Sequence, residues 1–340
     1  MSVHIVNLSE LEPSWCWLKT SFSHRPELVW DHASTQSSRL PLGIPKRAAM
    51  ARAGAALRTR KLLAGCGQPL LVSHGPRMTM FAVLALGKRA TETPHLAFSF
   101  NFTNLPTGLM RFTMGRAFAQ VNEFTVFSNV ERKLYADYFD LPVERFMMRY
   151  WAVRPPHVGT PSVPRIAGNY ICALGSQARD YRVLIESMKL LPMLRLVVVT
   201  NPESVAGLEI PSNVQILSRV PLPEAMNILA HSRLMVLPLR DSVVPCGHVT
   251  IVSAMHLGKT CIVTDSEGIS DYVQSGVNGR TVPARDVPAL VAAIDELCAS
   301  EALRTTYANA ARIFATEHCS ESNAVLDFQG SMDRLLNSLE

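Results

Sequence analysis

Apolar runs and mixed apolar and polar stretches alternate along the first half of the chain. Short apolar or β-branched runs predict strands, and stretches whose apolar positions follow the helical repeat predict helices. Strands are expected at 4–8, 28–30, 70–73, 96–100 and 124–127, and helices at 46–63, 79–87, 109–120 and 131–139. Because strands that alternate with helices pair in parallel, the first half predicts a doubly wound α/β sheet.

The second half repeats this alternation. Strands are expected at 170–174, 194–199, 214–217, 234–239 and 260–264, and helices at 179–190, 223–231, 249–257, 287–299, 301–318 and 322–336. Between the halves, the sequence VRPPHVGTPSVP is rich in proline and poor in core residues, which is typical of a linker. We therefore expect domains at 1–152 and 166–320, a linker at 153–165, and a C-terminal helix at 321–340 that is free to cross back to the first domain.

Length and composition fit two folded domains. The chain has 340 residues, 48% of them hydrophobic and 18% charged, which is enough for two cores of about 150 residues each. No apolar run approaches the roughly 18 residues of a membrane-spanning helix, and the N-terminus lacks a signal-peptide pattern. Seven cysteines without a CxxC pair are typical of reduced thiols in a cytoplasmic protein.

Charge is distributed unevenly. Residues 1–150 carry 18 Lys and Arg against 10 Asp and Glu, whereas the remainder carries 15 against 18, so the first half is expected to face an anionic partner. A basic stretch from Lys46 to Lys61 has an apolar side and favours binding to an anionic membrane, and 109–118 mixes basic residues with Met and Phe. Core helices with charged outer faces explain both stretches equally well. Nucleic acid is not an expected partner, because aromatic residues make up 7% and no nucleic-acid motif occurs.

The most informative stretch is 252–273, which reads VSAMHLGKTCIVTDSEGISDYV. It contains an apolar helix end, a turn at Gly258, a β-rich run, and a second turn at Gly268 that opens a short helix. Turns and helix N-termini delivered to one edge of a sheet suit the binding of a phosphorylated ligand.

The same stretch resembles the donor-site signature of the retaining GT-B glycosyltransferases of family four. That signature reads Glu-Ala-Met-Ala-x-Gly-x-Pro-Val-Val-Ala-Thr and then Gly-Gly-x-x-Glu, and the matching residues here are Ala254, Met255, Gly258, Val263, Thr264 and Gly268. Two departures matter, because Ser253 and Pro245 stand where the family has its two glutamates. The resemblance implies a GT-B fold, in which two Rossmann-like domains face a central cleft. The first domain would bind the acceptor and the second a nucleotide-sugar donor.

A glycine turn after the strand at 170–174 is the first candidate phosphate site. Gly175 can adopt a conformation closed to other residues, which would place Ser176 and Arg179 near a helix N-terminus. The resemblance implies that Arg179 clamps the donor diphosphate and neutralises charge on the departing nucleotide, with Ser176 in place of the family's first Arg. A surface Arg in the first turn of a helix is the alternative.

The second candidate phosphate site is PCGHVT at 245–250. Gly247 lets the backbone approach a phosphate, and the N–H groups of His248, Val249 and Thr250 head the next helix. An ordinary strand-to-helix turn is the alternative. By position in the family pattern, Ser253 is expected at the ribose and the loop at Pro221 at the nucleobase.

The resemblance also implies a polar residue at a strand tip in the first domain, close to the scissile bond. Asn101 lies near that place and His74 ends the preceding strand, so either is a candidate to hydrogen-bond the transferred sugar. A retaining reaction of this kind needs no base beyond the leaving phosphate.

These observations predict a glycosyltransferase that moves a hexose from a UDP- or GDP-sugar to a saccharide or lipid-linked saccharide, with retention. Biosynthesis of a surface polysaccharide or glycoconjugate, in the cytoplasm or on the inner face of the membrane, is the expected setting. No Asp-x-Asp occurs, so neither a metal nor another cofactor is expected. A catalytically silent GT-B subunit that binds nucleotide or acts as a scaffold is the alternative, because both glutamates are replaced. A dinucleotide-dependent oxidoreductase is disfavoured, since no G-x-G-x-x-G follows a strand.

Overall fold

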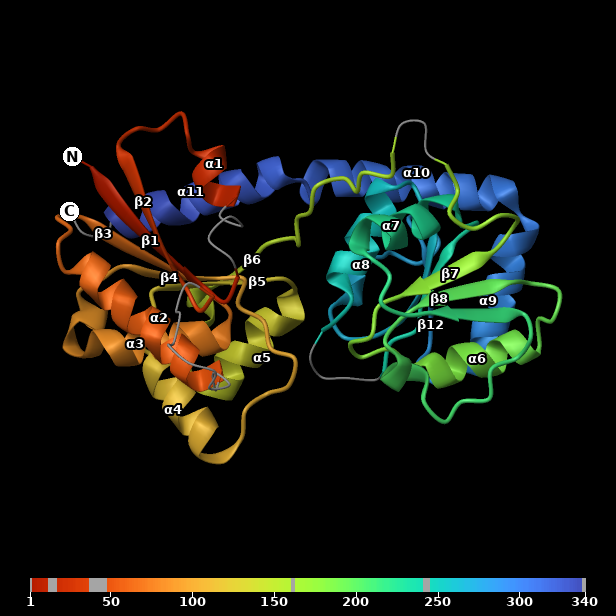
Figure 1. The fold of residues 1–340 in the computed structure, drawn as a ribbon, viewed down its shortest axis with the longest axis horizontal. Coiled ribbons are helices and arrows are strands. Elements are labelled where there is room, and N and C mark those ends of the chain that lie inside the picture. Colours follow the sequence, from red (N-terminus) through yellow and green to blue (C-terminus); the bar gives the residue numbers. More distant parts are fainter. Residues whose placement is uncertain (1, 12–16, 37–47, 160–162, 241–244, 338–340) are drawn as a thin grey trace, which may run out of the picture. The chain divides into compact units, whose positions relative to one another are not determined.

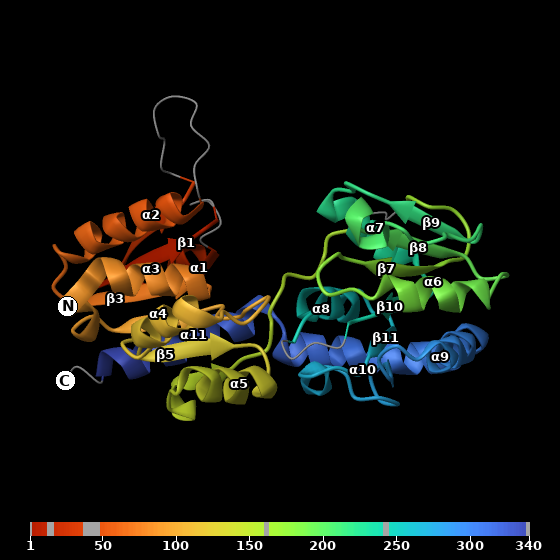
Figure 2. The same ribbon diagram turned by 90° about the horizontal axis from the view of Figure 1, so that it is seen from below.

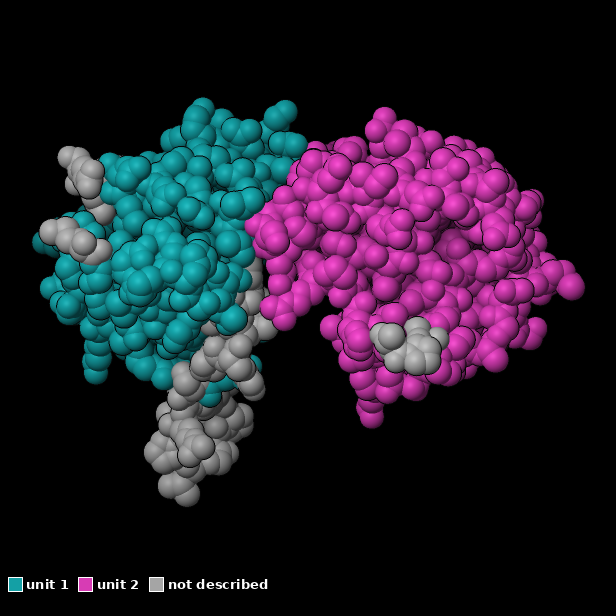
Figure 3. Space-filling model, turned by 90° about the horizontal axis from the view of Figure 1, so that it is seen from above, with its two compact units in different colours: residues 1–149, 325–340 teal, residues 150–324 magenta. Residues whose placement is uncertain are grey.

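The computed structural model describes residues 2–11, 17–36, 48–159, 163–240 and 245–337. The chain forms two compact units, coloured separately in Figure 3. Unit 1 comprises Met1–Arg149 and Val325–Glu340, and unit 2 comprises Tyr150–Ala324. Among the described residues, each unit has one six-stranded sheet in which all pairs of neighbouring strands are parallel. The predicted α/β class with two parallel sheets is confirmed.

The sheet of unit 1 has the order β2-β1-β3-β4-β5-β6 (Figure 1). Its apolar strands occupy β1 (Val3–Ser9), β2 (Leu28–Ser34), β3 (Pro69–His74), β4 (His95–Phe98), β5 (Glu123–Val126) and β6 (Phe146–Met148). The helices of this unit are α1 (Trp17–Ser21), α2 (Ala48–Leu63), α3 (Pro76–Leu86), α4 (Gly108–Phe118) and α5 (Asn129–Phe139), with 3-10 turns η2 (Gly87–Thr91) and η3 (Val143–Arg145). Helices α2, α3 and α4 lie side by side (Figure 2).

The last helix of the chain, α11 (Glu321–Asn337), supplies part of the core of unit 1. Phe328 is fully buried, with ring centroids 5.6 Å from Phe22, 5.8 Å from Trp30 and 5.9 Å from Phe98. Arg334 donates from Nη2 to both carboxylate oxygens of Glu123 at 3.0 Å. Apolar burial and a two-oxygen ion pair therefore hold this helix to the unit.

The sheet of unit 2 has the order β12-β11-β10-β7-β8-β9. Its strands are β7 (Ile171–Leu174), β8 (Leu196–Val199), β9 (Val214–Leu217), β10 (Met235–Leu237), β11 (Cys261–Thr264) and β12 (Arg280–Val282). Its helices are α6 (Tyr181–Lys189), α7 (Leu222–His231), α8 (His248–His256), α9 (Val287–Ala299) and α10 (Glu301–His318), with 3-10 turns η4 (Pro202–Val205) and η5 (Ile269–Asp271).

Strand order in unit 2 locates its ligand-binding edge. The chain runs outward from β7 to β9 and then returns to add β10 on the other side of β7. Adjacent loops leave the sheet in opposite directions at such a reversal, and ligands bind there, beyond the carboxyl ends of the strands. The carboxyl ends of β7 and β10 are therefore the place to look for a site.

Several features differ from the sequence-based expectations. The short elements α1, β6 and β12 were not predicted. The stretch predicted as a linker groups with unit 2, where the Val153 amide donates to the Cys319 carbonyl at 3.2 Å and the Arg165 amide to Asn227 Oδ1 at 2.9 Å. Six cysteines lie among the described residues, all as free thiols and four of them buried. Across the same residues, no helix has both the length and the hydropathy to cross a bilayer.

Candidate functional site

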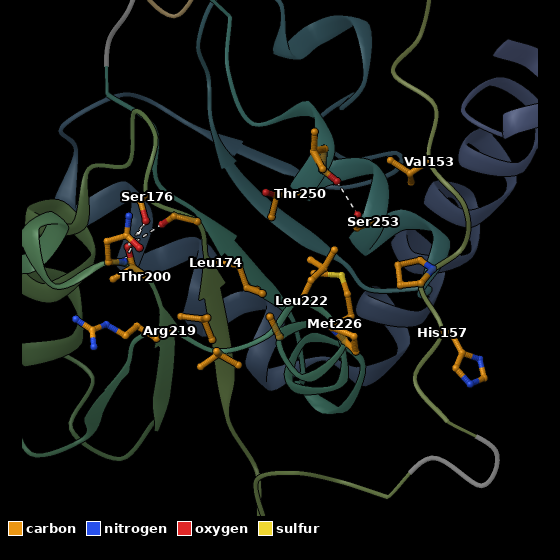
Figure 4. Close-up of a pocket in the computed structure, with 18 of the residues that line it drawn as sticks. Val153, His157, Leu174, Ser176, Thr200, Arg219, Leu222, Met226, Thr250 and Ser253 are labelled. Carbon is orange, nitrogen blue, oxygen red and sulfur yellow. Dashed lines mark hydrogen bonds between the residues drawn. The ribbon is translucent and has the colours of Figure 1, made fainter. Parts of the chain in front are cut away.

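A cavity of about 680 Å³ lies in unit 2 beyond the carboxyl ends of β7 and β8 (Figure 4). Its walls come from five places in the chain. The segments are Leu174–Ser176, Val199–Asn201, Arg219–Met226, Val249–Ser253 and Val153–His157, each contributing some of its residues. The cavity thus lies at the carboxyl edge of the sheet, next to β7 as the strand order indicated, but on the side of β8 and β9 and not of β10.

Hydroxyl groups gather at one end of the cavity, where Ser176 and Thr200 lie together in Figure 4. Thr200 Oγ1 donates to the Gly175 carbonyl at 2.9 Å and lies 3.2 Å from Ser176 Oγ. The Asn201 amide donates to Ser176 Oγ at 3.0 Å. Gly175 has a φ of +101°, a conformation that L-residues rarely adopt, so glycine is required at this turn.

Arg179 is 4% exposed and lies beneath this turn, so the alternative of a surface Arg in the first turn of a helix is wrong. Its Nε donates to the Leu174 carbonyl at 3.0 Å and its Nη1 to the Gln177 carbonyl at 2.8 Å. Its Nη2 donates to Thr250 Oγ1 at 3.1 Å. No carboxylate forms an ion pair with it among the described residues, and burial lowers the pKa of the guanidinium. A buried positive charge held by neutral acceptors favours an anion nearby.

The local backbone explains why Arg179 turns inward. Ala178 has a φ of +56°, and the Arg240 amide donates to its carbonyl at 2.9 Å. Helix α6 begins only after Asp180, whose carboxylate accepts from the Val183 amide at 3.4 Å. Arg179 therefore precedes the helix and lies in an extended bridge with Leu239.

The start of α8 forms another wall of the cavity. Gly247 caps the helix with a φ of +100°, and a Cβ there would lie 2.9 Å from Leu237 Cδ2, so the turn packs directly on β10. Val249, Thr250 and Ser253 line the cavity. Ser253 Oγ donates to the Val249 carbonyl at 2.7 Å (Figure 4), which leaves its oxygen as an acceptor toward the cavity.

His248 is placed differently from its neighbours on α8. It is 6% exposed, does not line the cavity, and packs on Tyr272 with ring centroids 4.6 Å apart. Burial lowers its pKa to about 4, so the ring is neutral at neutral pH. Pro221 also stays outside the lining, as the residue that caps α7, whereas its neighbour Val220 faces the cavity.

Several lining residues were not identified from the sequence. Thr200, Asn201 and Arg219 follow β8 and β9 directly, so the rule that ligands lie beyond the carboxyl ends of parallel strands would have found them. Met226 and His157 carry no such signal, because a helix face and an extended segment bring them to the cavity.

The two candidates in unit 1 lie at the carboxyl edge of its sheet. His74 ends β3 opposite Phe98 of β4, and Asn101 follows β4 as an exposed residue. His74 Nε2 lies 2.6 Å from Asn7 Oδ1, and burial lowers the pKa of His74 to about 4. A neutral His74 therefore donates this hydrogen bond and offers no acidic proton at neutral pH.

Part of unit 2 matches a known protein family. Residues 168–300 match the family model described as glycosyl transferases group 1. A search of curated protein sequences gave no match.

Solved structures similar over the whole chain are glycosyltransferases of the GT-B fold. A glycosyltransferase from Rickettsia africae is 12% identical, with a TM-score of 0.73 over 98% of this chain and 99% of its own. The sucrose-phosphate synthase of Thermosynechococcus elongatus is 14% identical, with a TM-score of 0.73 over 100% of both chains. HepE of Anabaena, in complex with UDP, is 14% identical, with a TM-score of 0.68 over 99% of this chain and 100% of its own. The GT-B fold predicted from the sequence is confirmed.

Proposed function

Since residues 168–300 form a domain of the group 1 glycosyl transferases, we propose that the protein transfers a hexose from a UDP- or GDP-sugar to a saccharide or lipid-linked saccharide. The observation that supports this most directly is the cavity beyond β7 and β8, with apolar walls and clustered hydroxyls. Arg179 does not line the cavity, but its buried guanidinium donates to Thr250, which does. The UDP in the Anabaena HepE structure supports a uridine nucleotide as the donor.

In this proposal the donor diphosphate lies between the Gly175 turn and the start of α8. The helix N-terminus offers partial positive charge to a phosphate. Thr250 accepts a hydrogen bond from Arg179, so its own hydroxyl proton is free to point to the diphosphate. Arg179 thus supports the negative charge that develops on the departing nucleotide, a charge that is stabilised strongly in a partly dry site.

The remaining candidates take supporting roles. Gly175, Ser176 and Val249 shape the phosphate site, with Gly247 as the cap of α8 behind them. Ser253 accepts from a ribose hydroxyl, and Val220, next to Pro221, lies against the base. Asn101 and His74 hydrogen-bond the transferred sugar. A neutral His74 fits a retaining reaction in which the leaving phosphate takes the proton of the acceptor hydroxyl.

Transfer is proposed to need no divalent metal, because Arg179 and the start of α8 supply the positive charge at the diphosphate. UDP binding should therefore persist in EDTA with an unchanged Kd. If EDTA abolished binding and manganese restored it, this part of the proposal would be wrong.

The acceptor is proposed to be a growing polysaccharide or glycoconjugate at the cytoplasmic face of a membrane, with unit 1 on the anionic lipid surface. The basic stretch from Lys46 to Lys61 was the sequence candidate for that contact. Lys46 lies outside the described residues, and α2 begins at Ala48.

Ligand binding to the purified protein tests the proposal. A nucleotide that binds only the folded state raises the thermal midpoint, so UDP or GDP is expected to do so, and the sugar nucleotide to raise it further. Thr250→Val removes the hydroxyl at nearly constant volume and should weaken nucleotide binding on the order of tenfold. Thr306→Val, at an exposed position on α10, is the matched control and should leave binding unchanged. No shift with any nucleotide would refute a nucleotide-sugar donor.

A catalytically silent nucleotide-binding subunit is the second candidate. It is favoured by Ser253, whose hydroxyl donates within α8 where the family has a glutamate. Nucleotide binding without hydrolysis or transfer of any sugar nucleotide, with acceptor saccharides present, would support it over the enzyme.

A further inference from the structure

Helix α4 exposes large apolar side chains at its start. Leu109 is 80% exposed, Met110 50% and Phe112 61%, whereas the buried face of the helix begins only at Met114. Single exposed apolar side chains are common, but adjacent ones form a patch that marks an interaction site. This end of α4 is therefore a candidate contact surface.

The patch continues onto α3. A groove lined by Leu84 and Lys88 on one side and by Phe112 and Arg116 on the other connects the two helices. Leu84 is 55% exposed, and the Arg116 guanidinium lies 5.7 Å from the centroid of the Phe112 ring. We call these residues the α3–α4 surface, comprising Leu84, Lys88, Leu109, Met110, Phe112 and Arg116.

The charge around this surface has one sign. Residues 48–118 contain nine Lys and Arg but a single acidic residue, Glu92. Within the described part of the chain, neither Lys88 nor Arg116 forms an ion pair. Arg111 differs, because its Nε and Nη2 donate to the Tyr138 carbonyl at 3.2 and 2.9 Å and thereby fix α4 to α5. The apolar side chains of α4 are thus surrounded by positive charge, on a helix that Arg111 fixes to its neighbour α5.

We infer that the α3–α4 surface docks on an anionic lipid bilayer, with the apolar side chains of α4 in the headgroup region and Lys88 and Arg116 on the lipid phosphates. Basic residues spread over three neighbouring helices suit an extended anionic plane better than a protein with a few carboxylates. This inference deepens the proposed membrane contact and moves its centre from the 46–61 stretch to α4.

Flotation of the full chain with vesicles tests this surface separately from catalysis. The protein should float with vesicles of phosphatidylcholine and phosphatidylglycerol, and much less with phosphatidylcholine alone or in high salt. Leu109→Ser and Phe112→Ser together should reduce the bound fraction on the order of tenfold or more. Lys88→Glu with Arg116→Glu should reduce it by a similar factor.

Matched controls separate this surface from general effects. Leu326→Ser, at a 66% exposed apolar position on α11, and Arg312→Glu, at an exposed position on α10, should leave flotation unchanged. Leu109→Ser alone should perturb folding less than the double variant, since the Leu109 side chain is 80% exposed. Equal flotation of the α4 variants and the parent would overturn the inference. A parent protein that does not float, but forms a dimer that the α4 variants lose, would also overturn it, because the surface would then bind a second copy of the chain. UDP binding, measured on the same samples, reports on the proposed transferase independently.

Discussion

A single buried guanidinium connects the two candidate phosphate elements of unit 2. Arg179 donates to carbonyls of its own turn and to the hydroxyl of Thr250 on α8, so it fixes both elements at once. An uncompensated buried charge is costly, and the surrounding carbonyls offset only part of that cost. The free energy of a bound diphosphate would offset the rest.

Arg179→Ala is therefore expected to lower both stability and donor binding. Loss of the side chain leaves the Leu174 and Gln177 carbonyls without their donor, which should reduce the free energy of unfolding by about 2–4 kcal/mol. Turnover should fall on the order of a hundredfold or more. Arg179→Lys keeps the charge but loses the planar fork and should recover part of both. Denaturant unfolding and initial rates check this, and an Arg179→Ala protein of parental stability and rate would contradict it.

Gly175→Ala should weaken nucleotide binding by displacing Arg179 or the turn. A Cβ at this position would lie 2.7 Å from Arg179 Nη2, at a φ of +101° that alanine adopts poorly. The guanidinium or the turn must shift, and we expect Kd for UDP to rise about tenfold or more. Gly54→Ala on α2, where a Cβ meets nothing within 4 Å, is the matched control and should bind UDP as the parent does. Isothermal calorimetry of both variants decides the matter.

Sequence reasoning reached the neighbourhood of this site but not its internal geometry. Gly175, Ser176, Val249, Thr250 and Ser253 line one cavity, because glycine turns and strand ends are visible as local patterns. The burial of Arg179 depends on the positive φ of Ala178 and on a bridge to Leu239, sixty positions along the chain. Such a long-range contact leaves no local pattern.

At the scale of elements, α11 contributes an aromatic side chain and an ion pair to the core of unit 1, which its sequence alone does not indicate. Phe328 fills the space between Phe22, Trp30 and Phe98, and Arg334 pairs with Glu123. Phe328→Ala should lower the free energy of unfolding of unit 1 by about 3–5 kcal/mol, because it removes a fully buried ring. Leu326→Ala, two residues earlier on the opposite side of α11 and 66% exposed, should change it by less than about 0.5 kcal/mol. Equal effects of the two substitutions on urea unfolding would contradict the packing described.

The elements that sequence patterns missed are short. β6 and β12 have three residues each and α1 has five, too few for a period of two or of 3.6 to show. Longer elements such as α9 and α10 begin at capping residues, Asp286 and Ser300, and their ends were predicted as the structure has them. Local patterns therefore recover the long elements, whereas pairing with a neighbouring strand defines the short strands β6 and β12.

At the scale of the molecule, buried titratable groups predict how stability depends on pH. Burial lowers the pKa of His74 and His248 to about 4 and of His95 to about 3, from an ordinary 6.5. Burial raises the pKa of Glu131 to about 7, from 4.5. Between pH 4.5 and 6.5, the unfolded chain binds three more protons on these histidines than the folded chain does, and one fewer on Glu131.

Stability should therefore rise with pH across this window and be lost on acidification. A net difference of two protons corresponds to about 2–3 kcal/mol per pH unit. The urea midpoint at about pH 5 is expected to lie well below that at about pH 7, and His248→Gln, which cannot titrate, should make the dependence shallower. A midpoint that does not fall on acidification would show that these rings are already protonated in the folded chain.

The return of α11 to unit 1 also sets an order for synthesis. Domains generally fold as they leave the ribosome, from the N-terminus onward. Here the first unit lacks Phe328 and Arg334 until the entire second unit has been translated, since residues 325–340 follow unit 2 in the chain. Until α11 has been translated, Phe22, Trp30 and Phe98 of the nascent first unit stay uncovered. Chaperones that hold incompletely folded chains are therefore expected to bind this apolar surface during translation.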